Sequence, residues 1–372
     1  MKKNGLIYRG FHPGDEVLIK DLYARVFKKK RSLPQWQWEF MDTPEGSSNI
    51  RVIEDDGKII GHVALIPLRF QYFDREIIVG KSEDSSLRKE YRGRRLFGKL
   101  EHECFETAAE KGFSISYSIS RTATQVHIKA GYHPLKAMQG YFVPLKPLLV
   151  TNEVAKTLQI SGVKKGIMKV VMKYLAQRFN TRSRRRKAPE SNLTIEKAEQ
   201  FDESLDELWR TFITQHKVIT IKRSANYLNW RFVEKPDQDY GIYLARSNDK
   251  LVGYLITTTV QRKEDFHTDL RIGVTSDFLI LENYQYALRP LFMEAVDYWI
   301  ADDCDCVINW IHQDSLYANA IRGELKRYGF VSMLGKFSIP ISVRALRDDV
   351  LPSEFYNEKN WFITLAFSGR WA

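Results

Sequence analysis

The chain has 372 residues, 44% hydrophobic and 28% charged, which is the size and composition of a folded protein with two separate cores. Its formal net charge of +11 comes from one segment, because eleven Lys and Arg residues and no acidic residue lie between positions 154 and 189, and this excludes a nucleic-acid-binding face spread over a domain. The three cysteines are too few for a disulfide framework or a zinc site, so we expect no metal site. The sequence shows no secretory leader and no run of about 18 apolar residues, so we expect a cytoplasmic protein.

The first 73 residues predict a strand, a helix and three further strands. A short strand begins near Leu6, and a helix follows to Phe27 with its apolar side chains spaced on one inner face. The segments 51–54 and 59–65 have the composition of strands around a hairpin turn, and 66–73 is expected to be a third strand.

Residues 76–132 carry the strongest local pattern. A β-branched run at 76–79 predicts a strand, and a polar turn with three arginines follows it. From Phe97 the apolar residues recur at the helical period as far as Gly112, 113–119 alternate as a half-buried strand, and 122–130 predict a short helix. The segment 141–145 is expected to be the last strand of this first unit.

The basic turn before the helix has the features of an anion site. The first backbone N–H groups of a helix have no partner inside it, and with nearby guanidinium groups they suit a phosphate or diphosphate. Gly93 and Gly98 would let the backbone approach such a ligand closely. The alternative is a solvated run of surface arginines, and this stretch alone favours neither.

The order of these elements resembles the GNAT superfamily of acyl-CoA-dependent N-acyltransferases. Residues 90–94 (EYRGR) match the opening of its pyrophosphate-binding loop, and 130–132 (AGY) match the end of its last helix. The family pattern places glycines at the positions of Arg95 and Phe97, and its frequent tyrosine general acid at His127. The resemblance implies an α/β (α+β) fold in which a central mixed sheet is flanked by helices.

The resemblance also implies a site for acetyl-CoA or another acyl-CoA. Its diphosphate would bind the backbone amides of the turn, and backbone N–H near Ser86 or Leu87 would hold the thioester oxygen. Glu83 and Asp84 are the candidate bases, and His127 would protonate the departing thiolate. Each has a structural alternative: Glu83 and Asp84 as cap or turn residues, and His127 as a core histidine. The turn residues implied in cofactor binding are Arg92, Gly93, Arg94, Arg95, Leu96, Phe97 and Gly98.

The second half of the chain repeats the first at a constant offset of 192. Trp38 corresponds to Trp230, Pro44 to Pro236 and Gly61 to Gly253, so we infer an internal duplication. The repeat predicts an acyl-CoA-binding unit at 1–147, a basic helical linker at 148–190 and a degenerate unit at 191–372. In the second copy a carboxylate, Glu282, lies where the first copy has its cationic turn, so this unit is expected to bind no acyl-CoA.

The basic linker predicts a helix with Ile167, Val170, Val171, Tyr174 and Leu175 on one face and lysines on another. Either residues 164–187 contact an anionic membrane surface, or the helix packs between the two units and a solvated tether follows it.

Three classes of function remain open. The first is an N-acetyltransferase that acts on a primary amine, and the bacterial two-unit proteins that the chain resembles suggest an amino sugar of a surface polysaccharide precursor. The second is an aminoacyl transferase of the Fem type, which uses charged tRNA, and the third is a non-catalytic protein that binds acyl-CoA or another ligand. The partner is therefore expected to be a small-molecule or sugar amine, with no specific nucleic acid; the sequence encodes neither the acceptor nor the oligomeric state.

Overall fold

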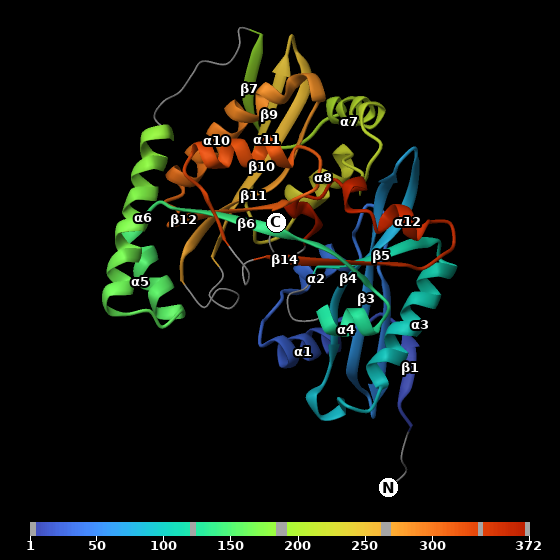
Figure 1. The fold of residues 1–372 in the computed structure, drawn as a ribbon. Coiled ribbons are helices and arrows are strands. Elements are labelled where there is room, and N and C mark those ends of the chain that lie inside the picture. The colour runs from blue at the N-terminus through green and yellow to red at the C-terminus, as the bar shows by residue number, and fades with distance from the viewer. Residues whose placement is uncertain (1–4, 120–123, 184–191, 262–268, 334–337, 369–372) are drawn as a thin grey trace.

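The computed structural model describes residues 5–119, 124–183, 192–261, 269–333 and 338–368. They form two units, each built on one half of a single mixed sheet (Figure 1). The first unit contains β1 (Ile7–Gly10), α1 (Asp15–Phe27), α2 (Leu33–Phe40), β2 (Asn49–Asp55), β3 (Lys58–Tyr72), β4 (Arg75–Leu87), α3 (Leu96–Glu110), β5 (Phe113–Ile119), α4 (Thr124–Lys129) and β6 (His133–Pro144).

The second unit follows a pair of helices, α5 (Pro147–Thr157) and α6 (Gly162–Ser183), which lie at the left edge of the molecule in Figure 1. No helix among the described residues is long and apolar enough to cross a bilayer. The elements of the second unit are β7 (Leu193–Ala198), α7 (Ser204–Gln215), β8 (Ile219–Ile221), α8 (Ala225–Phe232), β9 (Gly241–Ser247), β10 (Lys250–Gln261), β11 (Arg271–Ile280), α10 (Leu288–Ala301), β12 (Cys306–His312), α11 (Ala318–Arg327), β13 (Val331–Ser332), β14 (Ile339–Ala345) and α12 (Pro352–Phe355).

The sheet of the first unit is buried on both faces. Ala64 and Ile66 of β3 pack in the cluster under α1 and α2, whereas Val63 and Leu65 pack in the cluster under α3. This alternation is the two-residue period of a strand covered on both sides. The helices that flank the sheet are therefore held by apolar side chains that point in opposite directions from one strand.

The two units exchange strands. The sheet order is β1-β2-β3-β4-β5-β14-β6-β12-β11-β10-β9-β7, so β14 from the end of the chain lies between β5 and β6. β14 pairs with β5 from Ile341↔Ile119 to Ala345↔Ile115, and β6 pairs with β12 from Met138↔His312 to Pro144↔Cys306. A strand was expected at 141–145, and β6 ends there at Pro144, but it begins at His133 and also pairs with β12 of the second unit. The division at 147 and 190 stays a prediction, since one sheet crosses both units.

Most local predictions around α3 are confirmed. β5 has the expected bounds, and α3 begins one residue before Phe97 and ends at Glu110. Two strands were expected within 59–73, but β3 is one strand of 15 residues. β4 continues to Leu87 through residues of turn-like composition, which therefore lie on a strand and not in the loop. Residues 122 and 123 of the predicted short helix lie outside the described residues.

Candidate active site

The cationic turn opens directly onto the N-terminus of α3. Arg95 is the N-cap residue, has the left-handed conformation (φ 59°, ψ 11°), and provides no side-chain hydrogen bond to the helix. This backbone conformation is the one that glycine adopts most easily, so Arg95 keeps the geometry of a glycine where the family pattern has one. The first amides of α3 thus remain open to a ligand.

The side chains of the turn leave this approach open. Arg92, Arg94 and Arg95 are exposed, and a Cβ added at Gly93 or Gly98 would meet no atom within 4 Å. Phe97 turns away from the solvent and packs against the apolar cluster under α3. The residues that differ from the family's glycines therefore do not close the turn, and the site fits a diphosphate.

β4 and β5 diverge toward the cationic turn. They pair in parallel only from Ile78 to Lys81 on β4 and from Phe113 to Tyr117 on β5. Beyond Tyr117, β5 continues its pairing with β14 instead. The divergence leaves a wedge between Ser82–Leu87 and the end of β5, in front of the turn that feeds α3.

A β-bulge interrupts β4 at this wedge. Ala64 of β3 pairs with Glu83 and His62 pairs with Ser86, so Asp84 and Ser85 together face one residue of β3. Asp84 has a positive φ of 51°. Ser86 and Leu87, whose backbone N–H groups were expected to hold the thioester oxygen, lie where β4 pairs with β3. The bulge at Asp84 and Ser85, just before them, instead leaves backbone groups outside this pairing.

A buried cluster of five charged side chains lies behind the bulge. Arg31 forms a bidentate ion pair with Asp84, and its second contact is to Glu39 at 3.2 Å. Lys81 forms an ion pair with Glu83 and lies 3.9 Å from Glu39. Burial raises the pKa of Glu39 above its ordinary value, against the effect of the two cations. With three carboxylates and two cations, the cluster favours a further positive charge beside it.

Glu83 and Asp84 differ in their surroundings. The Asp84 side chain is 4% exposed and held by Arg31, whereas that of Glu83 is 15% exposed. The pKa of Tyr117 is raised well above its usual range by burial and, to a smaller extent, by Tyr227 and Glu83. Glu83 therefore lies close enough to Tyr117 of β5 for their charges to interact.

The end of the chain joins β5 to α8. The Tyr117 hydroxyl donates to the carbonyl of Phe367 at 3.0 Å, and Arg231 of α8 donates to the carbonyl of Ser368 at 2.8 Å. Phe367 is fully buried against Phe70 and Tyr117. No local pattern in the sequence could indicate these contacts, because Tyr117 and Phe367 are 250 residues apart.

His127 of α4 lies on the other side of the wedge. Its ring is 3% exposed, its Nε2 is 3.4 Å from the Ser118 hydroxyl, and Tyr132 packs against it at 5.1 Å between ring centroids. Burial lowers the pKa of His127 to about 4. The imidazole is thus neutral near pH 7, where it can donate a hydrogen bond but is a weak source of protons.

Arg31 is a site residue that the sequence reasoning missed. Its counterpart at the offset of 192 is Arg223, and the counterpart of Asp84 on β11 is Asp277. Arg223 holds Asp277 through two contacts of 3.1 Å, with both side chains at most 1% exposed. The same offset joins Ser32 and Ser224, which cap α2 and α8 through their hydroxyls. Extending the repeat to these positions could have found the pair.

The second unit has no counterpart of the open turn. A 3₁₀ helix at Glu282–Ala287 leads straight into α10, and the amide of Leu288 donates to Gln285 O. Glu282 lies in place of the arginines. The backbone amides that could bind an anion here are therefore partly occupied by hydrogen bonds within the chain, and the nearby side chain of Glu282 is negatively charged.

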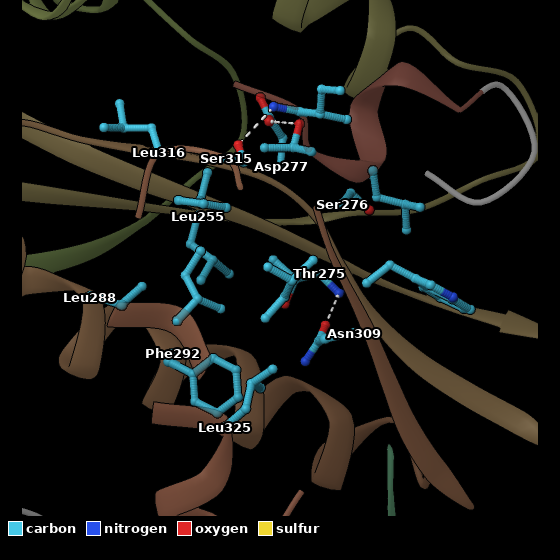
Figure 2. Close-up of a pocket in the computed structure, with 17 residues that line it drawn as sticks. Leu255, Thr275, Ser276, Asp277, Leu288, Phe292, Asn309, Ser315, Leu316 and Leu325 are labelled. Carbon is cyan, nitrogen blue, oxygen red and sulfur yellow. Dashed lines mark hydrogen bonds between the residues drawn. The ribbon is translucent and has the colours of Figure 1, made fainter. Parts of the chain in front are cut away.

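The wedge between β11 and β12 is a narrow apolar cavity of ≈ 40 Å³ (Figure 2). Leu255, Leu288, Phe292 and Leu325 surround it, and Leu325 stands at the position that corresponds to His127. Three lining polar atoms, on Thr275, Ser276 and Asn309, have no hydrogen-bond partner among the described residues. No Lys or Arg lines the cavity, so it has room for a few waters but no means to bind a diphosphate.

Comparison with known proteins agrees with this geometry. Residues 8–134 match the family described as the acetyltransferase (GNAT) domain. Residues 8–134 are therefore similar to the GNAT acetyltransferases, a class that takes its acyl group from acyl-CoA. No curated protein matches the chain.

Solved structures share the fold over nearly the whole chain. A GCN5-related N-acetyltransferase from Anabaena variabilis is 14% identical with a TM-score of 0.60, and the alignment covers 92% of this chain and 73% of that one. A probable N-acyltransferase from Enterococcus faecalis is 10% identical with a TM-score of 0.62 and the same coverage. Saccharomyces cerevisiae N-myristoyltransferase with bound myristoyl-CoA is 10% identical with a TM-score of 0.58, over 91% of this chain and 82% of that one. At these identities the likeness shows the fold alone.

Proposed function

We propose that the first unit transfers an acetyl or other acyl group from acyl-CoA to the primary amine of a small molecule, such as an amino sugar of a polysaccharide precursor. One observation carries this proposal. The groups that the reaction needs are present in only one copy of a duplicated fold, since Ser276 replaces Glu83 and Glu282 lies in place of the arginines. The ion pair of Arg31 and Asp84 is present in both copies, which supports a structural role for it.

The proposed mechanism is direct attack of the amine on the thioester. The amides at the start of α3 and the exposed arginines bind the diphosphate, and backbone N–H groups freed by the bulge at Asp84 and Ser85 stabilise the oxyanion. Glu83 accepts the proton that the attacking ammonium must lose. His127, as a neutral imidazole, donates a hydrogen bond to the sulfur as it leaves; a thiol with a pKa of about 8.5 needs little further help.

The charged cluster supports an amine as the acceptor. Its three carboxylates outnumber its two cations, and this excess of negative charge attracts an ammonium to the side of β4 where Glu83 lies. The end of the chain links the second unit to Tyr117, which interacts with Glu83. The degenerate unit thus serves as the wall of the acceptor site.

Calorimetry with acetyl-CoA and with free coenzyme A tests the cofactor site. Arg92→Ala combined with Arg94→Ala should weaken both affinities about tenfold or more, because charge-assisted hydrogen bonds to the diphosphate are lost. Arg25→Ala, which removes an exposed arginine from α1, is the matched control and should leave both affinities unchanged. Equal affinity in the double variant would move the cofactor site elsewhere.

Acetyl transfer to glucosamine-type amines, with free thiol as the readout, tests the reaction. Acetyl-CoA binding without transfer to amino sugars or to a wider panel of primary amines would instead favour a non-catalytic protein. A protein that transfers only to other amines would keep the mechanism and reject the sugar acceptor.

A further inference from the structure

α6 presents an apolar stripe to solvent, on the face that points away from the protein. Val163, Ile167, Val170 and Tyr174 are 80%, 60%, 67% and 59% exposed, and their spacing of four, three and four residues places them on one side of the helix. The residues that hold α6 to the protein, which include Phe179, lie on the opposite side and are buried. Of the apolar face expected for the linker, Ile167, Val170 and Tyr174 are thus exposed, whereas Leu175 is buried.

Basic side chains flank the stripe on both sides. Lys169 and Lys173 lie toward one edge, and Lys164, Arg178 and Arg182 follow the other, whereas Lys165 lies on the side of α6 opposite the stripe. The five bordering cations are exposed, and α6 contains no Asp or Glu. The surface thus combines an apolar centre with two cationic borders.

The position of α6 leaves this surface accessible. α5 and α6 form a helical pair at the left edge of the molecule in Figure 1, on the opposite side from α3. α5 adds exposed apolar side chains to the same pair, with Leu148, Leu149 and Leu158 at 50%, 44% and 46% exposure. Exposed apolar side chains gathered in this way mark a binding surface more often than scattered ones do.

We propose that the stripe and its basic borders dock the protein on an anionic lipid bilayer, with α6 lying parallel to the membrane. A bilayer offers negative headgroups at its surface and an apolar layer directly below, which matches cations on either side of an apolar row. Lysine and arginine reach the headgroups while their methylene stems follow the apolar side chains inward. A nucleic acid would pair with the cations but leave the apolar row without a partner, so the stripe favours the bilayer. This proposal is independent of the proposed reaction.

Flotation of the full chain with vesicles tests the docking. Vesicles of phosphatidylcholine mixed with phosphatidylglycerol should bind the protein, vesicles of phosphatidylcholine alone should bind it weakly, and added salt should release it. Val170→Asp with Tyr174→Asp should reduce the partition coefficient at least about tenfold, because two carboxylates replace apolar contacts. Replacing Lys164, Lys169 and Lys173 by Gln should reduce it by about fivefold for each cation.

A matched control separates the stripe from exposure in general. Val17 of α1 is 61% exposed, so Val17→Asp makes the same change at similar exposure on a different surface, and it should not alter the partition coefficient. Far-ultraviolet circular dichroism checks that each variant is folded. The proposal is overturned if anionic vesicles do not bind the folded protein, if the stripe variants bind as the native protein does, or if a duplex RNA competes fully with the vesicles. A dimer in ultracentrifugation that Val170→Asp dissociates would assign the stripe to a second copy instead.

Discussion

Trp38 and Trp230 stack on each other where the two units meet, with ring centroids 5.0 Å apart and planes 23° from parallel. Each indole N–H donates to the backbone carbonyl of the other residue, at 2.8 Å and 3.2 Å. The two positions are related by the repeat offset, so one ancestral residue supplies both sides of the contact. The duplicated units therefore face each other around a pseudo-twofold axis at this pair.

The reciprocal contact predicts coupled losses of stability. Trp38→Phe and Trp230→Phe should each lower the free energy of unfolding by about 1–3 kcal/mol, since each removes one hydrogen bond and leaves a buried carbonyl without its donor. The double variant should lose less than the sum, by about 0.5–1.5 kcal/mol. Urea unfolding measures all four proteins. Trp209→Phe is the control: the indole N–H of Trp209 has no partner among the described residues, so this variant removes an indole without removing a hydrogen bond. If the losses of the two single variants simply added up in the double variant, the coupling would be contradicted.

Glu83→Gln tests the general base. Its loss is expected to lower kcat by about 10²- to 10⁴-fold while the affinity for coenzyme A changes little, and the melting temperature should fall because the buried Lys81 loses its ion-pair partner. Steady-state kinetics at saturating acetyl-CoA, with calorimetry for the affinity, provide the readouts. A variant that keeps native turnover would remove Glu83 from the mechanism.

For the aspartates of the duplicated ion pair we expect a loss of stability and no direct effect on catalysis. Asp277→Asn leaves the Arg223 guanidinium without its charge partner in a buried site, and should cost about 3–5 kcal/mol of stability without altering the affinity for coenzyme A. Asp84→Asn should destabilise the first unit in the same way through Arg31. Chemical unfolding measures both variants. If Asp84→Asn abolished turnover in a protein of native stability, Asp84 would be a catalytic group after all.

His127→Phe tests the role of the buried imidazole. The variant should reduce kcat about tenfold or more and leave coenzyme A binding intact, because one hydrogen bond to the leaving sulfur is lost. Because the pKa of His127 is about 4, the pH–rate profile of the native enzyme should show no inflection from this residue between about pH 6 and 8. Native turnover in the variant would show that His127 is a core residue only.

Glu101 on α3 predicts a pH-dependent change in stability. The residue is 2% exposed, one of its oxygens has no partner among the described residues, and burial raises its pKa to about 7 against the opposing effect of Arg344. The folded state thus binds more protons than the unfolded state between about pH 4.5 and 7, so stability falls as the pH rises through this window.

Glu101→Gln should remove this dependence. The variant and the native protein are expected to be about equally stable at pH 5, whereas at pH 8 the variant should be more stable by about 3 kcal/mol at most. Thermal unfolding at both pH values gives the comparison, and Glu110→Gln on the exposed side of α3 is the control. A constant difference across pH would mean that Glu101 does not titrate in this window.

The sequence predicted what is encoded locally. The helical period defined α3, the alternation of 113–119 defined β5, and the glycine-containing basic turn lies at the start of α3 as expected. Arg95 lies where the family pattern has a glycine, and it adopts the left-handed conformation that glycine favours. The fixed offset of 192 identified the duplication and the degenerate second site.

The remaining features depend on contacts between distant segments. Ser82 to Ser86 have the composition of a turn, yet they form a strand because β3 pairs along them. The exchange of β6 and β14 carries no local signal, since each strand has the same pattern whichever neighbour it pairs with. Likewise, the charged cluster brings together α2, β4 and the segment between the first two helices, and only the folded chain shows that Arg31 reaches Asp84.

The position of β14 affects how this protein is made. Since residues 339–345 fill the gap between β5 and β6, a ribosome must translate almost the entire message before the N-terminal unit can close. Until then the emerging polypeptide exposes unpaired edges of β5 and β6, which are targets for chaperones and for intermolecular association. Expression of either half alone should yield aggregates, and co-expression of the two halves should restore a soluble complex.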